Sequence, residues 1–325
     1  MKQNLFKSSF ADEINAYLAT KTNAGFQERS FKNHLRLFDT FCVNRKIDEA
    51  AFNNDDVESW LEQRQDEATT THYNRINTIK HFLSYLFLKG YDVVVCYDIR
   101  FKPTDFLPHI FSFDEIKRYF KAVDMYCSGY NRKDAIQYPV LFRILYCCGT
   151  RLNETLGIRK EDVDLAAGVI KLNESKNNNE RYIVLGDDLQ SLIKKFADKC
   201  FYLLSDDDFI FTNTKGKRLD GKTVYEKHRQ FLATSNIPYI GGGKGPRIHD
   251  WRHTMAVYSF KQMSDSGLDL YVALPILSAY LGHKTIFATE KYVRLTMSMF
   301  PDIEEKFRHK TERVFTVEVS SDETD

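Results

Sequence analysis

Apolar residues recur at helical spacing through the first ninety residues, and this periodicity constrains the fold more than any other feature. The clearest runs are Phe31, Leu35, Phe38 and Phe41, and later Ile76, Ile79, Phe82, Leu83 and Leu86. Residues spaced three or four apart share one face of a helix, and that face has to be buried. Thr69, Thr70 and Thr71 are candidate N-caps for the last long helix, and Gly90 is its stop signal. We predict a bundle of three or four helices between Phe10 and Gly90.

A second domain is predicted after a linker. The stretch from Tyr91 to Pro108 contains two prolines and no clear period, which is typical of an interdomain segment. Ser112 and Glu115 have the spacing of a capping box, so a helix is expected to begin there. A further apolar helix is predicted from about Tyr138 to Cys148. With 325 residues the chain is long enough for two domains, each with its own core.

Two short β-rich runs interrupt the helical pattern. They cover Val169 to Leu172 and Tyr182 to Leu185, and the polar stretch NESKNNNER separates them. This arrangement predicts a β-hairpin with a long tip. The helical period then returns as far as about Arg308. The predicted fold class is therefore mainly α with a small β-sheet at one edge of the second domain.

The net charge of +1 hides an uneven distribution along the chain. Residues 1–107 hold 14 basic and 15 acidic side chains, residues 108–300 hold 28 and 22, and residues 301–325 hold 4 and 8. The middle segment is thus the basic one, and the end of the chain is acidic. That acidic end is as consistent with a solvated terminus as with a partner-binding segment.

The cysteines and the first residues indicate the compartment. Cys42, Cys96, Cys127, Cys147, Cys148 and Cys200 form no C-x-x-C pair and have no histidine at zinc spacing. We interpret them as reduced thiols, mostly in the core, and predict no metal site. The sequence MKQNLFKSSFADEINAYL becomes charged before a signal peptide or membrane span can form. A soluble cytoplasmic protein without a membrane partner is expected.

Four segments carry candidate functional residues. They are Arg151 with Glu154 in CCGTRLNETLGI, Lys176 in the hairpin tip, His249 with Arg252 in PRIHDWRHTMA, and His283 with Tyr292 in LSAYLGHKTIFATEKYVRLT. Each has an ordinary interpretation by itself: a surface ion pair, a solvated lysine, a helix cap, or one tyrosine among 18. The order and spacing of the whole set are what carry information.

This ordered set resembles the tyrosine recombinase, or phage integrase, family, including its Xer-like and mobile-element members. That family has an arginine after a Gly-x-Arg turn, a lysine in a β-hairpin, a His-x-x-Arg pair, a histidine after Leu-Gly and a tyrosine nine residues on. Every one of these positions is filled here. Two departures occur, Thr150 before the arginine and Trp251 inside the His-x-x-Arg motif, and neither replaces a reacting group. The likeness to mobile-element integrases is closer than that to Xer proteins.

The resemblance implies a role for each residue, and elementary chemistry agrees with it. Tyr292 would attack a DNA phosphate and form a 3′-phosphotyrosyl intermediate, which stores the bond energy without a metal or cofactor. Arg151 and Arg252 offer forked donors to the negative phosphate oxygens. Lys176 is the expected proton donor to the departing 5′ oxygen.

The remaining three residues have supporting roles. His249 and His283 would hydrogen-bond the same phosphate oxygens or help to move protons. Glu154, three residues after Arg151, is placed to hold its guanidinium.

One motif points to a nucleotide site instead. Residues 216–223, GKRLDGKT, satisfy the P-loop pattern. That motif should follow a buried strand directly, but Thr212, Asn213, Thr214 and Lys215 intervene after the short apolar run FIF. No strand ending in a metal-binding Asp is apparent. We therefore predict no nucleotide partner.

The resemblance gives a complete expectation for organisation and function. Residues 1–102 would form a helical core-binding domain, residues 108–300 the catalytic domain, and residues 301–325 a tail that docks on a neighbouring subunit. The two domains would close as a clamp around double-stranded DNA. The expected activity is site-specific recombination through a Holliday junction, with a dimer on each site and a tetramer in the synapse. A type IB topoisomerase-like enzyme and a catalytically inactive DNA-binding protein are the alternatives.

Overall fold

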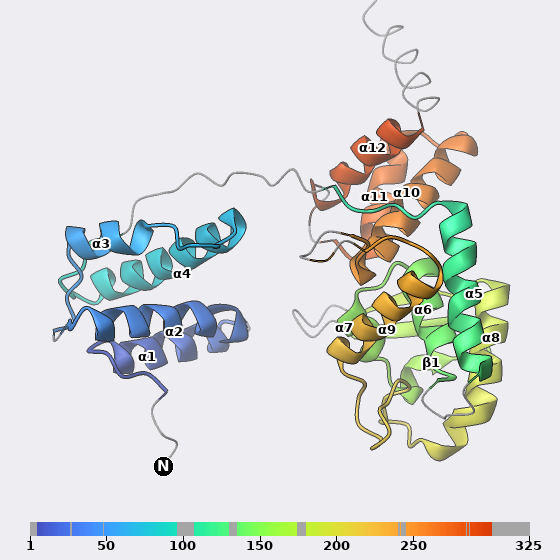
Figure 1. The fold of residues 1–325 in the computed structure, drawn as a ribbon, viewed down its shortest axis with the longest axis horizontal. Coiled ribbons are helices and arrows are strands. Elements are labelled where there is room, and N and C mark those ends of the chain that lie inside the picture. Colours follow the sequence, from blue (N-terminus) through green and yellow to red (C-terminus); the bar gives the residue numbers. More distant parts are fainter. Residues whose placement is uncertain are drawn as a thin grey trace, which may run out of the picture. The chain divides into compact units, whose positions relative to one another are not determined.

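A computed structural model describes residues 5–26, 28–47, 49–95, 107–129, 135–173, 180–239, 241, 245–283, 285 and 287–300. The chain divides into two compact units, Met1–Phe106 and Leu107–Asp325 (Figure 1). Each unit has its own buried apolar cluster. No helix in the described residues is long and apolar enough to cross a membrane.

The first unit is a helical bundle, as the periodicity predicts. Its described helices are α1 (Ala11–Asn23), α2 (Glu28–Asn44), α3 (Asn54–Leu61) and α4 (Thr69–Leu88). Aromatic rings fill the space between them: Phe38 contacts Phe10, Trp60 and Phe82 at centroid distances of 5.5, 5.4 and 5.8 Å. Offset and edge-on ring pairs of this kind add to the free energy gained by burying apolar area.

One detail of the helix ends was predicted wrongly. Thr69 is the first residue of α4, and the N-cap is Ala68, whose side chain makes no capping hydrogen bond. Because three threonines are consecutive, the sequence pattern did not indicate at which of them the helix would begin. The predicted stop is confirmed, because α4 ends at Leu88, its C-cap is Lys89, and Gly90 follows.

The second unit is mostly helical with one small sheet, which confirms the predicted fold class. Its helices are α5 (Phe113–Gly129), α6 (Tyr138–Cys147), α7 (Leu152–Leu156), α8 (Asp187–Cys200), α9 (Gly221–Thr234), α10 (Ile248–Asp265), α11 (Leu270–Leu281) and α12 (Phe287–Met299), with 3-10 turns at Lys160–Asp162 and Phe201–Leu203. The predicted capping box before α5 is present: the Ser112 backbone N–H donates to Glu115 Oε2 at 2.8 Å, and the Glu115 N–H donates to Ser112 Oγ at 3.2 Å.

The sheet extends the predicted hairpin by one strand. Its antiparallel order is β1 (Val163–Asp164), β2 (Val169–Asn173) and β3 (Glu180–Val184). Ile170 pairs with Ile183, and both side chains are buried against the helices. The two-residue strand β1 has no alternating pattern long enough to be read from sequence, so it was not predicted.

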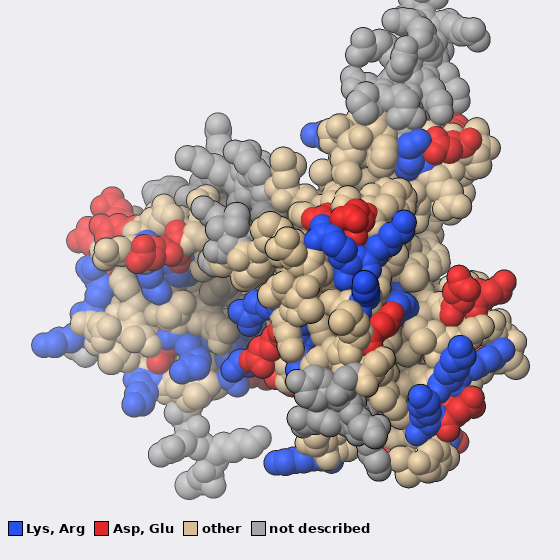
Figure 2. Space-filling model, turned by 45° about the vertical axis from the view of Figure 1, so that its right-hand side comes forward, with Lys and Arg blue, Asp and Glu red and all other residues tan. Residues whose placement is uncertain are grey.

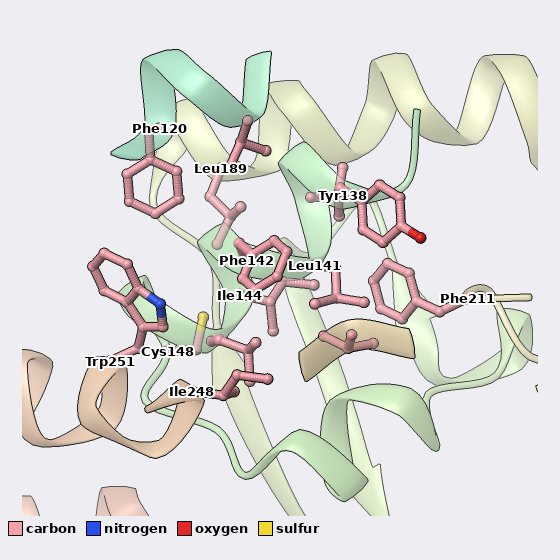
Figure 3. Packing of buried hydrophobic residues seen from close by; sticks show 14 of the residues in the cluster. Phe120, Tyr138, Leu141, Phe142, Ile144, Cys148, Leu189, Phe211, Ile248 and Trp251 are labelled. Atoms are coloured by element: carbon pink, nitrogen blue, oxygen red, sulfur yellow. The ribbon is translucent and has the colours of Figure 1, made fainter. Parts of the chain in front are cut away.

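The core of the second unit has two parts that meet on α10. The larger cluster joins α5, α6, α8, α9, the sheet and the first turn of α10; Figure 3 shows Trp251 and Ile248 packed with Phe120, Cys148 and Ile144. The smaller cluster joins the rest of α10 to α11 and α12, and Tyr292 belongs to it. Helix α10 therefore extends from the larger cluster into the smaller one. The polar residues near its start lie between the two clusters.

Trp251 occupies a core position and fastens the start of the second unit to α10. Its indole is fully buried, and the Phe111 ring lies flat against it with a centroid distance of 3.8 Å and an interplanar angle of 3°. The Phe111 backbone N–H donates to Thr254 Oγ1 at 3.0 Å, and the Tyr258 hydroxyl donates to the Phe111 carbonyl at 3.2 Å. The tryptophan inside the His-x-x-Arg motif thus provides a platform for Phe111.

The cysteines are less buried than predicted. Cys42 and Cys148 lie in the core, Cys127 and Cys200 are partly buried, and Cys147 is exposed. Cys96 lies outside the described residues. Cys147 is the last residue of α6, where the helix turns toward Gly149, and this places its side chain away from the core.

Candidate active site

Arg151 is held at the start of α7 by a carboxylate from the same turn. Its backbone N–H donates to Glu154 Oε2 at 2.9 Å and its Nη1 donates to Glu154 Oε1 at 2.5 Å. The predicted partnership of Arg151 with Glu154 is therefore present. Gly149, two residues earlier, has φ of +58°, and a Cβ there would lie 3.1 Å from Met255 Sδ. Only glycine makes this tight turn against α10 without strain.

A second arginine shares the same carboxylate. Arg181 on β3 donates from Nη2 to Glu154 Oε2 at 2.7 Å, so Glu154 receives hydrogen bonds from two guanidinium groups. Burial by itself would raise the pKa of Glu154, but the hydrogen bonds from Arg181 and Arg151 outweigh it and lower the pKa to about 2. Glu154 is therefore ionised at neutral pH and fixes both arginines.

Arg252 is buried and joins two turns of the site. It is 1% exposed, and its guanidinium donates from Nη1 to the Gly149 carbonyl at 2.8 Å and from Nη2 to the Leu281 carbonyl at 2.6 Å. Burial, and then the charge of Arg151, lower the pKa of Arg252 to about 10. Arg252 therefore remains a cation at neutral pH.

His283 follows a second tight turn and lies beside Tyr292. Gly282 has φ of +65°, and a Cβ there would lie 3.0 Å from Arg181 Nη1. The Gly282 carbonyl accepts a hydrogen bond from Arg151 Nη2 at 3.3 Å. His283 Nδ1 is hydrogen-bonded to Thr289 Oγ1 at 2.6 Å, and its ring is nearly parallel to that of Tyr292, with a centroid distance of 6.2 Å and an angle of 9°.

Tyr292 lies on α12 and is completely enclosed. Its exposed fraction is 0%, and its hydroxyl is hydrogen-bonded to Nδ1 of His253 on α10 at 3.0 Å. Burial raises the pKa of Tyr292, although the charge and hydrogen bond of Arg252 act in the opposite direction. The phenol is therefore protonated at neutral pH.

His249 is in the first turn of α10, close to this pair. Its ring meets the His253 ring edge-on, with a centroid distance of 4.7 Å and an angle of 88°. Burial, and then the charges of Arg252 and Lys291, lower the pKa of His249 to about 4. The ring is consequently neutral in this state.

The structure brings together most of the predicted residues, and one lies outside the described part. Hydrogen bonds and ring contacts connect them through the turns at Gly149 and Gly282: Arg151, Glu154, Arg252, His283, Tyr292 and, through His253, His249. Lys176 falls between Asn173, where β2 ends, and Glu180, where β3 begins, and residues 174–179 are outside the described residues.

Two residues of the site were missed. His253 directly follows Arg252, and its one sequence signal is a position one helical turn after His249. Arg181 had no such signal, because its partner Glu154 lies 27 residues away and the contact depends on how β3 packs against α7.

The P-loop-like sequence forms a closed turn. The side-chain oxygen of Asn213 accepts from the N–H groups of Lys215 and Lys217, and the Asn213 carbonyl accepts from the Gly216 N–H. Helix α9 begins at Gly221, directly before the Lys-Thr pair. Within the motif, this turn uses the N–H groups of Gly216 and Lys217, its first two residues. Within the described ranges, no group of three or more His, Cys, Asp or Glu side chains is placed to hold a metal ion.

The comparisons with known proteins identify the family. Residues 110–299 match the phage integrase family, and the chain belongs to this family of tyrosine recombinases. The putative integrase/recombinase y4rB of Sinorhizobium fredii is 27% identical over 298 residues, covering 88% of this chain and 93% of that protein.

Two solved structures are similar in fold. The recombinase XerH bound to a palindromic difH substrate in a post-cleavage complex has a TM-score of 0.66 at 17% identity, covering 93% of this chain and 85% of that one. A lambda integrase tetramer bound to a Holliday junction has a TM-score of 0.61 at 16% identity, covering 86% and 76%. These likenesses confirm the fold, including the N-terminal helical part. They also show that relatives of this chain bind DNA, in one case as a tetramer.

Proposed function

We propose that this chain is an active site-specific DNA recombinase that cuts and rejoins strands through Tyr292. The observation that carries the proposal is the position of Tyr292 beside His283, which follows the turn whose Leu281 carbonyl binds the buried cation Arg252. Arg151 is connected to the same turns through the Gly282 carbonyl. Cations fixed in this way stabilise the charge that develops on a phosphate under attack.

The proposed reaction conserves the number of phosphodiester bonds. The Tyr292 oxygen attacks phosphorus, the bond from phosphorus to the 5′ oxygen breaks, and Lys176 protonates that oxygen. The product is a 3′-phosphotyrosine and a free 5′ hydroxyl, which can attack in turn and expel the tyrosine. His249 and His283 are assigned hydrogen bonds to the non-bridging oxygens.

The two units are given separate roles in DNA binding. We assign residues 1–102 to core-binding contacts, residues 108–300 to catalysis, and residues 301–325 to docking on a neighbouring subunit. Lys and Arg side chains are distributed over both units and mixed with acidic ones on the face shown in Figure 2, so local basic groups exist despite the small net charge. Phosphate contacts from such groups supply most of the affinity for DNA. A dimer on each site and a tetramer in the synapse complete the proposal.

A nicked suicide substrate tests the activity directly. When a nick lies close to the cut, the fragment carrying the 5′ hydroxyl diffuses away and the protein remains attached to DNA. We expect a covalent adduct on denaturing gels with DNA that carries candidate recombination sites. If no candidate sequence gives an adduct while band shifts show specific binding, the chain is an inactive DNA-binding protein.

Lys176→Ala should slow cleavage of ordinary DNA by about 10²–10⁴-fold, the usual contribution of a positioned general acid. The loss should be much smaller when sulfur replaces the 5′ bridging oxygen, since a thiolate leaves with little need for a proton. Single-turnover rates on the two substrates measure the contrast. Lys171→Ala, on β2 of the same hairpin, is the matched control. An equal loss on both substrates would mean that Lys176 positions the phosphate and another group donates the proton.

Ending the chain after Phe300 should leave binding to a single site nearly intact and reduce cooperative binding to adjacent sites. The cut preserves α12 and the Phe300 ring, which contacts the Tyr258 ring at 6.1 Å. The removed segment has apolar residues on a charged background, which suits docking on another subunit. Band shifts on one-site and two-site DNA, beside a recombination assay, measure the effect. Full cooperativity and recombination in the shortened chain would show that residues 301–325 do not dock on a neighbouring subunit.

A further inference from the structure

His253 has the contact with the Tyr292 hydroxyl that a proton acceptor requires. Its Nδ1 lies 3.0 Å from the hydroxyl oxygen, and the two side chains are 4% and 0% exposed. The rings are 5.5 Å apart between centroids, at an angle of 50°. The contact joins α10 to α12 in the interior of the protein, where water does not compete for the phenolic proton.

Both partners of this hydrogen bond are neutral at neutral pH. Burial, followed by the neighbouring His249, Lys291, Arg247 and Arg252, lowers the pKa of His253 to about 2, so the imidazole is neutral. Tyr292 has a raised pKa and retains its proton. In the tautomer whose proton is on Nε2, Nδ1 accepts from the Tyr292 hydroxyl, and we assign this tautomer to His253.

The other two histidines are placed differently. His283 uses Nδ1 for Thr289 and lies with its ring plane nearly parallel to the Tyr292 ring. His249 meets the edge of His253 rather than Tyr292. We therefore keep His249 and His283 assigned to hydrogen bonds with the phosphate oxygens.

We propose that His253 is a further catalytic residue, which accepts the phenolic proton as Tyr292 attacks the phosphate and returns it when the strands rejoin. The proposal rests on the function proposed above. In the attack, the O–H bond of Tyr292 breaks, the oxygen–phosphorus bond forms, and the proton moves to His253 Nδ1. The imidazolium formed is stabilised by the incoming phosphate, whose negative charge offsets the cations that surround the ring.

Two substitutions separate proton acceptance from simple positioning. His253→Phe keeps a ring in the space and removes the acceptor. In His253→Asn, the amide oxygen can take the place of Nδ1 as a hydrogen-bond acceptor, but it is far too weak a base to accept the proton. Both variants should slow single-turnover adduct formation by about 10²–10⁴-fold. Band shifts and thermal unfolding identify any variant that fails to fold.

A more acidic phenol supplies the decisive measurement. When 3,5-difluorotyrosine replaces Tyr292, the nucleophile loses its proton more readily, and the loss caused by either substitution should shrink to less than about tenfold. The same replacement in the otherwise unchanged chain is the control. The sulfur-containing substrate used for Lys176 should not rescue the His253 variants, because it helps only the leaving group.

Three outcomes would overturn the assignment. The first is an equal loss of cleavage rate in the His253 variants with tyrosine and with difluorotyrosine at position 292. The second is a normal rate in His253→Asn. The third is faster cleavage in His253→Phe, which would mean that the contact restrains Tyr292. Failure of the unchanged chain to form any adduct would instead refute the proposed function, so the two failures are distinguishable.

Discussion

Tyr292→Phe should abolish the covalent protein–DNA adduct while leaving DNA binding unchanged. The substitution removes the attacking oxygen and keeps the ring, which is part of the cluster joining α10, α11 and α12. It also leaves His253 Nδ1 without its hydrogen-bond donor, which should lower the free energy of unfolding by about 1–3 kcal/mol. The suicide-substrate gel measures the adduct, a band shift measures binding, and thermal unfolding measures the stability loss.

Tyr258→Phe is the matched control for this experiment. Its hydroxyl also makes an interior hydrogen bond, to the Phe111 carbonyl at 3.2 Å, but it has no contact with the proposed nucleophile's hydroxyl. Adduct formation should persist in Tyr258→Phe. An adduct of normal yield in Tyr292→Phe would show that a different residue attacks the phosphate.

Arg151→Lys and Arg252→Lys should each reduce the cleavage rate by about 10²–10³-fold, the loss typical of removing one fixed donor from a charge-stabilising site. A lysine supplies one point charge and cannot reproduce the planar fork. At position 252 it also cannot reach the Gly149 and Leu281 carbonyls together as the guanidinium does. Single-turnover cleavage on the suicide substrate measures both variants.

A matched control is needed because Arg252 has a structural role as well. Arg118 on α5 donates from its guanidinium to the Ser235 and Asn236 carbonyls, so Arg118→Lys breaks a comparable bridge elsewhere in the second unit. We expect Arg118→Lys to lose stability and to cut at nearly the normal rate. Near-normal cleavage in both Arg151→Lys and Arg252→Lys would show that these residues do not belong to the catalytic site.

Features that depend on local sequence could be predicted. The helical bundle follows from apolar spacing, and the Ser112–Glu115 capping box and the Arg151–Glu154 pair each span three residues of one turn. Such contacts are almost fixed once the local conformation is known. The family resemblance then predicted that residues far apart in the sequence form one site, which no local pattern indicates.

Features that depend on packing could not be predicted. The His253–Tyr292 contact spans 39 residues and exists because α10 lies against α12. Arg181 reaches Glu154 because β3 lies near α7, and its packing against Gly282 also explains why a glycine precedes His283. The enclosure of Tyr292 is likewise a property of the assembled cluster, since nothing in EKYVRLT distinguishes a buried tyrosine from an exposed one.

The stacking of Phe111 on Trp251 has a mechanical consequence. The polypeptide enters the second unit at Leu107, and four residues later it is fixed to α10 by a ring stack and two hydrogen bonds. The same helix carries His249 and Arg252, which flank Trp251 in the sequence. A force on the chain at this entry point would therefore be transmitted to α10 through the ring stack and the two hydrogen bonds. A displacement of the chain at Phe111 would therefore move the turn of α10 that carries two of the residues we propose to act on DNA.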